Sequence, residues 1–196
     1  MQLAPSLHRL GTSSLVNSYL VEEAGELTLI DAGLPGLWKD LVAELHTIGR
    51  SPSDIRAVLL THGDVDHVGF AERLRHDHGV PVWVSDADAA EARGEVPKPK
   101  AAIGPVRLLP TVQFLAYAAL RGGLRSTPVK EVRTFGAGVS LDVPGSPQVI
   151  GLPCHTPGSV AFYMRGVDAL FMGDAMTTRS VVMRDRVPAC GSRAPA

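Results

Sequence analysis

The segment at residues 55–67, IRAVLLTHGDVDH, constrains the fold more than any other part of the chain. Its first six residues are largely apolar, as in a strand that is buried on both faces. Directly after them come four potential metal ligands, His62, Asp64, Asp66 and His67. An Asp-rich turn that caps a helix would explain a lone D-x-D pair, but the two bracketing histidines favour half of a metal site.

The rest of the chain predicts a layered α/β fold, because helices alternate with strands in the first half and strands dominate the last third. Gly and Pro turns separate the short apolar runs near the C-terminus. The expected strands are 14–21, 26–31, 55–60, 80–85, 139–145, 147–153, 160–165 and 169–173, and the expected helices are 37–49, 67–79 and 86–93.

A Pro-rich linker at 94–105 leads into an unusually apolar segment at 103–124. Charged and polar residues and a proline interrupt this segment, so it predicts a buried or lid helix rather than a membrane-surface helix. We therefore expect a single domain over 1–196, with a cap or insertion segment at 98–130 laid over the core.

Composition narrows the function classes. The 196 residues carry a net charge of −1 with both signs interspersed, so no nucleic-acid partner is expected. Two cysteines, Cys154 and Cys190, are too few for a disulfide framework and suit a reducing compartment, hence a cytoplasmic location. We expect neither a signal peptide nor a membrane span, because no basic-then-apolar leader and no apolar run of about 20 residues is present.

Two further potential ligands follow predicted strands in the last third of the chain. His155 follows the strand at 147–153, and Asp174 follows the strand at 169–173. Each feature alone is common in loops. Together with the first cluster, they place His and Asp side chains at the ends of several strands, where α/β proteins usually carry function.

Four motifs occur in one order: LIDAG (29–33), THGDVDH (61–67), HTPGS (155–159) and GD (173–174). In these motifs the chain resembles the metallo-β-lactamase superfamily of metal-dependent hydrolases. The resemblance implies a four-layer αβ/βα sandwich with metal ions where the strands end. It implies six ligands for two metals: His62, Asp64 and His155 for the first, Asp66 and His67 for the second, and Asp174 as the bridge. Asp31 would support the ligand loop through hydrogen bonds.

The chain departs from the family pattern in two places. Asp64 stands where the family usually has His, which shifts the metal preference from zinc, the expected ion, toward manganese or iron. The family normally has another His after the bridging Asp, but here no His follows His155. We therefore expect a shortened C-terminus, and either one or two bound metals. A missing terminal strand would expose a sheet edge, from which a homodimer is expected.

The expected function is hydrolysis of a small-molecule ester, thioester or lactone-type carbonyl. A bound metal would lower the pKa of its water to about 7, and the resulting hydroxide would attack the carbonyl carbon. Asp66 would accept or deliver the proton. The apolar insertion favours an acyl or other nonpolar group. A phosphodiesterase, and a degenerate metal- or ligand-binding member without turnover, remain open alternatives.

Overall fold

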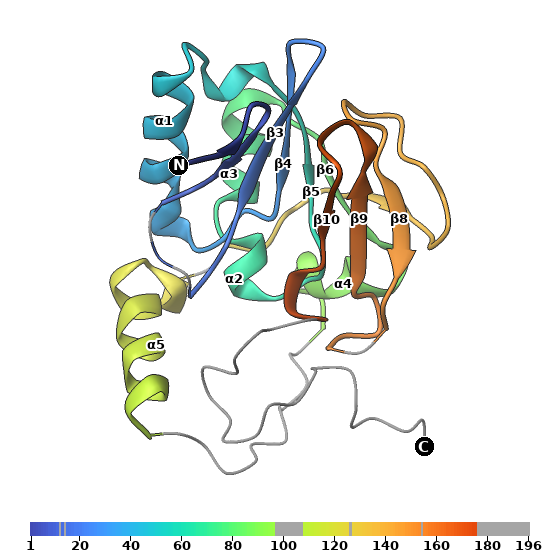
Figure 1. The fold of residues 1–196 in the computed structure, drawn as a ribbon. Helices are drawn as coiled ribbons and strands as arrows, with labels where there is room; N and C mark the ends of the chain where they lie inside the picture. Colours follow the sequence, from blue (N-terminus) through green and yellow to red (C-terminus); the bar gives the residue numbers. More distant parts are fainter. Residues whose placement is uncertain (12, 14, 97–107, 126, 154, 176–196) are drawn as a thin grey trace.

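Two β-sheets pack face to face in the computed structural model, and helices cover the outer face of the larger sheet (Figure 1). The structure describes residues 1–11, 13, 15–96, 108–125, 127–153 and 155–175. Both cysteines, the start of the predicted cap and the C-terminal tail therefore lie outside the described residues. Within the described part, no α-helix follows residue 120, so three of the four expected layers are visible.

The larger sheet has seven strands in chain order, antiparallel at first and parallel from the fourth strand onward. The smaller sheet has three antiparallel strands. The larger sheet consists of β1 (Gln2–Ala4), β2 (Leu7–Arg9), β3 (Tyr19–Glu23), β4 (Glu26–Ile30), β5 (Ile55–Leu59), β6 (Val82–Ser85) and β7 (Arg133–Phe135). The smaller sheet consists of β10 (Ala169–Phe171), β9 (Val160–Met164) and β8 (Gln148–Gly151), in that spatial order.

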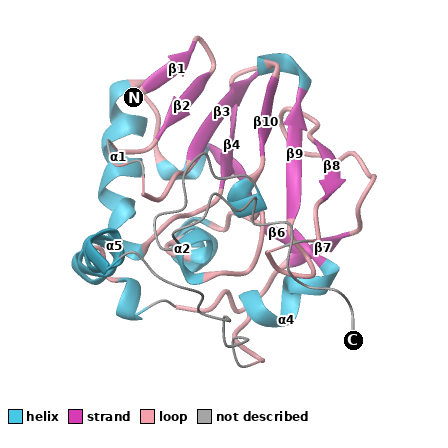
Figure 2. Ribbon diagram, turned by 60° about the horizontal axis from the view of Figure 1, so that its bottom comes forward, coloured by secondary structure: helices cyan, strands magenta, loops and turns pink. Residues whose placement is uncertain are grey.

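Two of the helices, α1 and α3, lie against the larger sheet on the side away from the smaller one (Figure 1). The short α2 and α4 lie at the ends of the strands, and α5 stands at the periphery (Figure 2). The helices are α1 (Trp38–Thr47), α2 (Val65–Val68), α3 (Ala71–His78), α4 (Ala89–Ala92) and α5 (Leu108–Leu120).

The central strands are buried on both faces, which explains their continuous apolar runs. In β4 and β5, Leu29 and Val58 belong to the core that faces the helices. Their neighbours Ile30 and Leu59 belong to the second core, which Phe162 of the smaller sheet completes. Because side chains alternate between the two faces of a strand, β4 and β5 each contribute to both cores. The second core, which lies between the sheets, holds them together.

The carboxyl ends of the parallel strands lie at one edge of the larger sheet. Asp31 follows β4, and the loop at 60–64 follows β5. The smaller sheet presents the turn at 155–159, before β9, and the end of β10 at the same edge (Figure 1). Parallel packing therefore gathers loops from distant parts of the chain into one place, as expected for an α/β protein.

Several predicted elements are wrong or shifted. The segment 139–145 is not a strand; it makes one isolated bridge, from Ser140 to Gln148, before a turn at Pro144 and Gly145. The strand expected at 14–21 begins only at Tyr19. The N-terminal hairpin of β1 and β2, and the three-residue β7, were not predicted because such short edge elements carry little periodic signal.

The helix expected at 67–79 is two helices, broken at Gly69. A Cβ at this position would lie 1.9 Å from the carbonyl oxygen of Gly33, so the chain must carry glycine to approach that loop. Ala32 N donates to the His67 carbonyl at 2.6 Å, and Phe70 N donates to Ala32 O at 3.3 Å. The break thus attaches α2 to the loop that follows β4.

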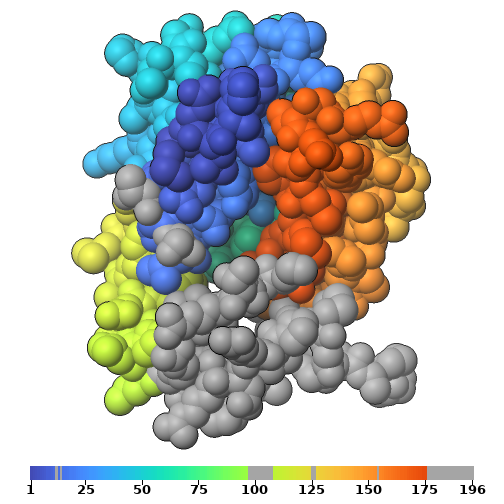
Figure 3. Space-filling view, in the orientation of Figure 1, coloured from blue at the N-terminus to red at the C-terminus, as the bar shows by residue number. Residues whose placement is uncertain are grey.

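The apolar segment does form a helix, α5, but of the two expected roles the buried one is wrong, and the lid stays a prediction. None of its residues is buried, and Leu120 exposes 88% of its surface. Figure 3 shows α5 in yellow-green at the surface of the molecule. The carbonyl of Arg121, just after the helix, accepts from Gly36 N at 2.7 Å. Among the described helices, none combines the length and the apolar character that crossing a membrane requires.

Candidate metal centre

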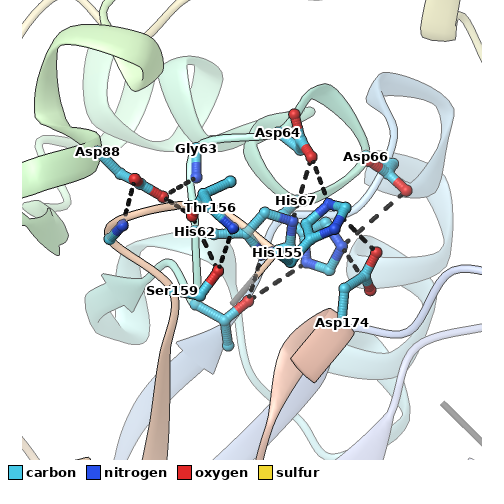
Figure 4. Close-up of polar contacts among 12 residues, drawn as sticks. His62, Gly63, Asp64, Asp66, His67, Asp88, His155, Thr156, Ser159 and Asp174 are labelled. Carbon is cyan, nitrogen blue, oxygen red and sulfur yellow. Dashed lines mark hydrogen bonds and ion pairs between the residues drawn. The ribbon is translucent and has the colours of Figure 1, made fainter. Parts of the chain in front are cut away.

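The structure brings five of the six predicted ligands into two overlapping groups (Figure 4). Within each group, the possible ligand atoms all lie within 4.8 Å of one another. His62, Asp64 and His155 form the first group, here called the His155 group; His62, His67 and Asp174 form the second, here called the His67 group. His62 belongs to both, so the two groups share one side chain.

The His155 group joins two loops that are 91 residues apart in sequence. His155 Nε2 lies 2.8 Å from Asp64 Oδ2, and His62 Nε2 lies 3.5 Å from the same oxygen. The His62 and His155 rings stand edge to face, with their centroids 5.0 Å apart. The three side chains thus direct imidazole nitrogens and a carboxylate toward one point.

The His67 group lies against the same ring. His67 Nε2 is 3.3 Å from Asp174 Oδ1, and the His62 and His67 centroids are 3.9 Å apart. The other oxygen of Asp174, Oδ2, is 3.9 Å from His155 Nε2. Asp174 therefore faces both groups, which is the position that a bridging carboxylate needs.

Asp66 belongs to neither group. Its Oδ2 lies 4.0 Å from His67 Nε2, and 22% of its side chain is exposed. Asp66 thus stands beside the His67 group, at the edge of the cluster, as Figure 4 shows. Asp66 was expected both to bind a metal and to move a proton. The geometry separates it from the five residues that converge.

A buried hydrogen-bond network orients the two histidines of the 62–67 loop. Asp31 accepts from Thr61 N at 2.8 Å, from Thr61 Oγ1 at 2.8 Å and from His67 Nδ1 at 2.9 Å. Because the Thr61 hydroxyl donates to Asp31, its oxygen accepts from His62 Nδ1, 3.1 Å away. In their neutral form, both imidazoles thus carry their proton on Nδ1, which leaves the Nε2 lone pairs for a metal.

Asp31 holds this position in a left-handed backbone conformation, with φ of 57°. Few residues other than glycine adopt it, although Asp tolerates it better than most. The bend at the end of β4 lets one side chain reach Thr61 and His67 together. The expectation that Asp31 supports the ligand loop thus has a direct geometric counterpart.

The donor set fits a divalent transition metal. His62 Nε2 is buried and has no hydrogen-bond partner within the described residues. A buried nitrogen without a partner is costly, and a metal would satisfy it. Imidazole nitrogens combined with carboxylate oxygens are the ligands that zinc, manganese and iron accept.

The pKa shifts of the ligand side chains also show that the cluster favours positive charge. Burial alone would lower the pKa of His67, but the charges of Asp31 and Asp174 outweigh it and raise that pKa well above its ordinary value. The contact with Asp64 likewise raises the pKa of His155. Burial would raise the pKa of Asp174, yet its bond with His67 and the neighbouring imidazoles lower it. A bound cation would replace these protons.

One buried carboxylate at the site was not predicted from the sequence. Asp88 follows β6 and is 1% exposed; it accepts hydrogen bonds from both the 62–64 loop and the 155–159 loop. Its position at a strand end is the signal that could have identified it. Asp86, two residues earlier, also follows β6 but is exposed. The sequence alone does not distinguish these two aspartates.

A family model described as the metallo-beta-lactamase superfamily matches residues 11–194. The chain belongs to the metallo-beta-lactamase superfamily. The resemblance carried by the four motifs is therefore confirmed, as is the α/β class.

Relatives and solved structures agree with this membership. The chain is 31% identical to the uncharacterized protein YobT of Bacillus subtilis over 166 residues, which is 84% of this chain and 63% of YobT. It is 28% identical to the probable metallo-hydrolase YflN of the same organism, over 90% of this chain and 66% of YflN.

A crystal structure of the metallo-beta-lactamase family protein TTHA1429 from Thermus thermophilus superposes with a TM-score of 0.67 at 26% identity. The match covers 91% of this chain and 62% of TTHA1429. The chain thus spans less than two thirds of the length of YobT, YflN and TTHA1429.

Proposed function

We propose that the protein is a metal-dependent hydrolase of ester, thioester or lactone-type carbonyls in small molecules. One observation carries the proposal: two ligand groups converge on His62, whose Nε2 is buried without a hydrogen-bond partner in the described residues. The superfamily depends on divalent metals, usually zinc. Zinc is therefore the expected ion, with manganese or iron as alternatives because of the additional carboxylate at position 64.

His62, Asp64 and His155 would hold one ion. His67 and Asp174 would hold a second, because the single Nε2 lone pair of His62 binds only one ion. When bound, such an ion supplies Lewis-acid chemistry, which lowers the pKa of water to about 7 and stabilises negative charge on a substrate oxygen. The chain itself aligns His62 and His67 before any ligand arrives. Asp31 and Thr61 fix the two imidazoles, so little reorganisation opposes binding.

Asp66 is the candidate proton acceptor. It lies beside the His67 group but outside both groups, and part of its carboxylate reaches solvent. A carboxylate that is close to the reacting centre and not held by several ligand contacts is free to take a proton and release it to the leaving group. This role is separate from metal binding, so the two can be tested independently.

We base the substrate class on the apolar composition of the segment around α5, which favours an acyl chain or another nonpolar group. This composition supports a neutral carbonyl substrate over a phosphodiester.

Metal analysis followed by a substrate panel tests the proposal. Purified protein dialysed against zinc should retain one or two ions per chain and hydrolyse at least one chromogenic ester, thioester or lactone in a panel that includes a phosphodiester. Asp66→Asn should keep the metal and lose about 100-fold or more in kcat. Loaded protein that turns over only the phosphodiester would contradict the substrate class, and loaded protein that is inert would favour a binding role without turnover.

A further inference from the structure

We propose that Asp88 is a positioning residue that fixes the 155–159 loop against the 62–64 loop and thereby aligns the His155 group. This inference rests on the proposed metal-dependent function. It concerns a residue that touches no member of the group and acts through the backbone and side chains beside them.

Three hydrogen bonds connect Asp88 to the two loops (Figure 4). Asp88 Oδ2 accepts from Gly63 N at 3.1 Å and from Thr156 Oγ1 at 2.6 Å. Asp88 Oδ1 accepts from Gly158 N at 2.8 Å. Gly63 lies between His62 and Asp64, and Thr156 follows His155, so two of these bonds end one residue away from a ligand.

The fit around the carboxylate is tight. A Cβ on Gly158 would lie 2.4 Å from Asp88 Oδ1 and 2.2 Å from Ser85 Oγ, so the 155–159 loop rests directly on Asp88. Thr156 N also donates to Ser159 Oγ at 2.9 Å, which closes the turn upon itself. A rigid turn seated on a buried carboxylate leaves the adjacent imidazole little freedom to move.

The two groups have different supports. Asp31 bonds to His67 directly and to His62 through Thr61, and within the described residues its side chain makes no hydrogen bond to the 155–159 loop. Besides Asp88, the main-chain bond from Val160 N to Thr61 O, at 2.9 Å, ties that loop to the larger sheet. Loss of Asp88 should therefore weaken the His155 group more than the His67 group.

An amide cannot replace this carboxylate. Asn has one acceptor oxygen, so in either orientation its amide N–H would face the N–H of Gly63 or of Gly158 in a buried place. Removing such a support beside a ligand typically weakens metal binding by about 10–100-fold. Thr156→Val removes the hydroxyl donor with little change in shape, and Thr156→Ser retains the hydroxyl.

The experiment is a Co²⁺ titration of metal-free protein, followed by visible absorption, with hydrogen exchange measured on the same samples without metal. Asp88→Asn and Thr156→Val should weaken binding by about 10–100-fold and change the Co²⁺ spectrum in the same direction as His155→Ala. Their 155–160 segment should also exchange faster before metal is added. Thr156→Ser and the exposed control Asp86→Asn should stay within about threefold of the wild-type affinity.

Each outcome decides the matter. Asp88→Asn with wild-type affinity and spectrum overturns the role of Asp88 and leaves the proposed function intact. A wild-type chain that binds no Co²⁺ overturns both. If Asp88→Asn does not fold, the pair Thr156→Val and Thr156→Ser decides the question, because equal affinity in these two variants overturns the inference.

Discussion

The two sheets contribute differently to the site that lies between them. The larger sheet supplies His62 and His67, whose side chains are 1% and 7% exposed and are fixed by Asp31 and Thr61. The smaller sheet supplies His155 and Asp174, whose side chains are 36% and 38% exposed. One half of the site is thus built into a core, and the other half is brought to it by loops.

This difference suggests how such a site assembles. A core-bound half is ordered by the folding of the larger sheet alone, because its hydrogen bonds are buried and local to β4 and β5. The loop-borne half gains its order from contacts across the interface between the sheets and from the ion. Metal binding should therefore change the smaller-sheet side more than the larger-sheet side.

The largest effect should come from the residue that both groups share. His62→Ala should remove metal binding and hydrolysis together, with a loss beyond the roughly 10–100-fold typical of an outer support. Equilibrium dialysis with zinc and a rate assay measure it, and His76→Ala, whose side chain is 70% exposed, is the control. Retention of one tightly bound ion by His62→Ala would show that the groups do not depend on a common ligand.

Metal addition should stabilise the two halves unequally. An ion at 100 times its Kd adds about 2.7 kcal/mol to the free energy of unfolding. Hydrogen exchange should slow mainly at 155–160 and 173–175, and little at 58–62, where protection already exists. Equal slowing in all three segments would contradict the idea that the larger sheet is ordered beforehand.

Asp31→Asn should affect the His67 side of the metal site, whereas Asp88→Asn should affect the His155 side. The amide cannot accept from Thr61 N, Thr61 Oγ1 and His67 Nδ1 as the carboxylate does. We expect metal affinity to fall by about 10–100-fold, with the His67 group affected first. Co²⁺ titration in a His155→Ala background, where only the His67 group is intact, isolates this effect, and unchanged affinity there would contradict the assignment.

The smallest expected effect concerns the stability of the metal-free protein on the larger-sheet side. Arg75 donates to both oxygens of Glu72, at 2.8 and 2.9 Å, and these bonds hold the pKa of Glu72 below its usual range despite burial. A lowered pKa stabilises the fold above the unfolded value of about 4.3. This contribution is lost as the pH falls through the lower folded value.

Glu72→Gln should therefore cost about 1 kcal/mol at pH 7 and nothing at pH values below the folded pKa. Urea unfolding of metal-free protein at several pH values measures this difference. The neighbouring Glu131, whose side chain is 85% exposed, provides the control Glu131→Gln, which should change stability by less than about 0.5 kcal/mol. A pH-independent loss in Glu72→Gln would assign the effect to packing instead.

The sequence predicted the parts of the molecule that depend on local pattern. The apolar runs of β4, β5 and β6 were predicted because burial on both faces leaves a continuous signal. The break at Gly69 was not predicted, because it arises from the approach of a distant loop. The segment 139–145 was misassigned because its apolar alternation is overridden by the turn that follows.

The same distinction holds at the site. His62, Asp64 and His67 could be predicted because they cluster in one motif, and His155 and Asp174 because they follow strands in a familiar order. Asp88 follows a strand as well, but spacing alone does not distinguish it from Asp86, since its partners are 25 to 70 residues away. The separation of Asp66 from the converging ligands is likewise a matter of side-chain geometry that spacing does not determine.

We propose that these side chains converge on a cation. Anomalous diffraction at the zinc edge, from crystals grown with zinc, locates that ion. We expect an anomalous peak among His62, Asp64 and His155, with any second peak beside His67 and Asp174. Crystals that contain zinc only elsewhere, with these five side chains turned apart, would contradict it.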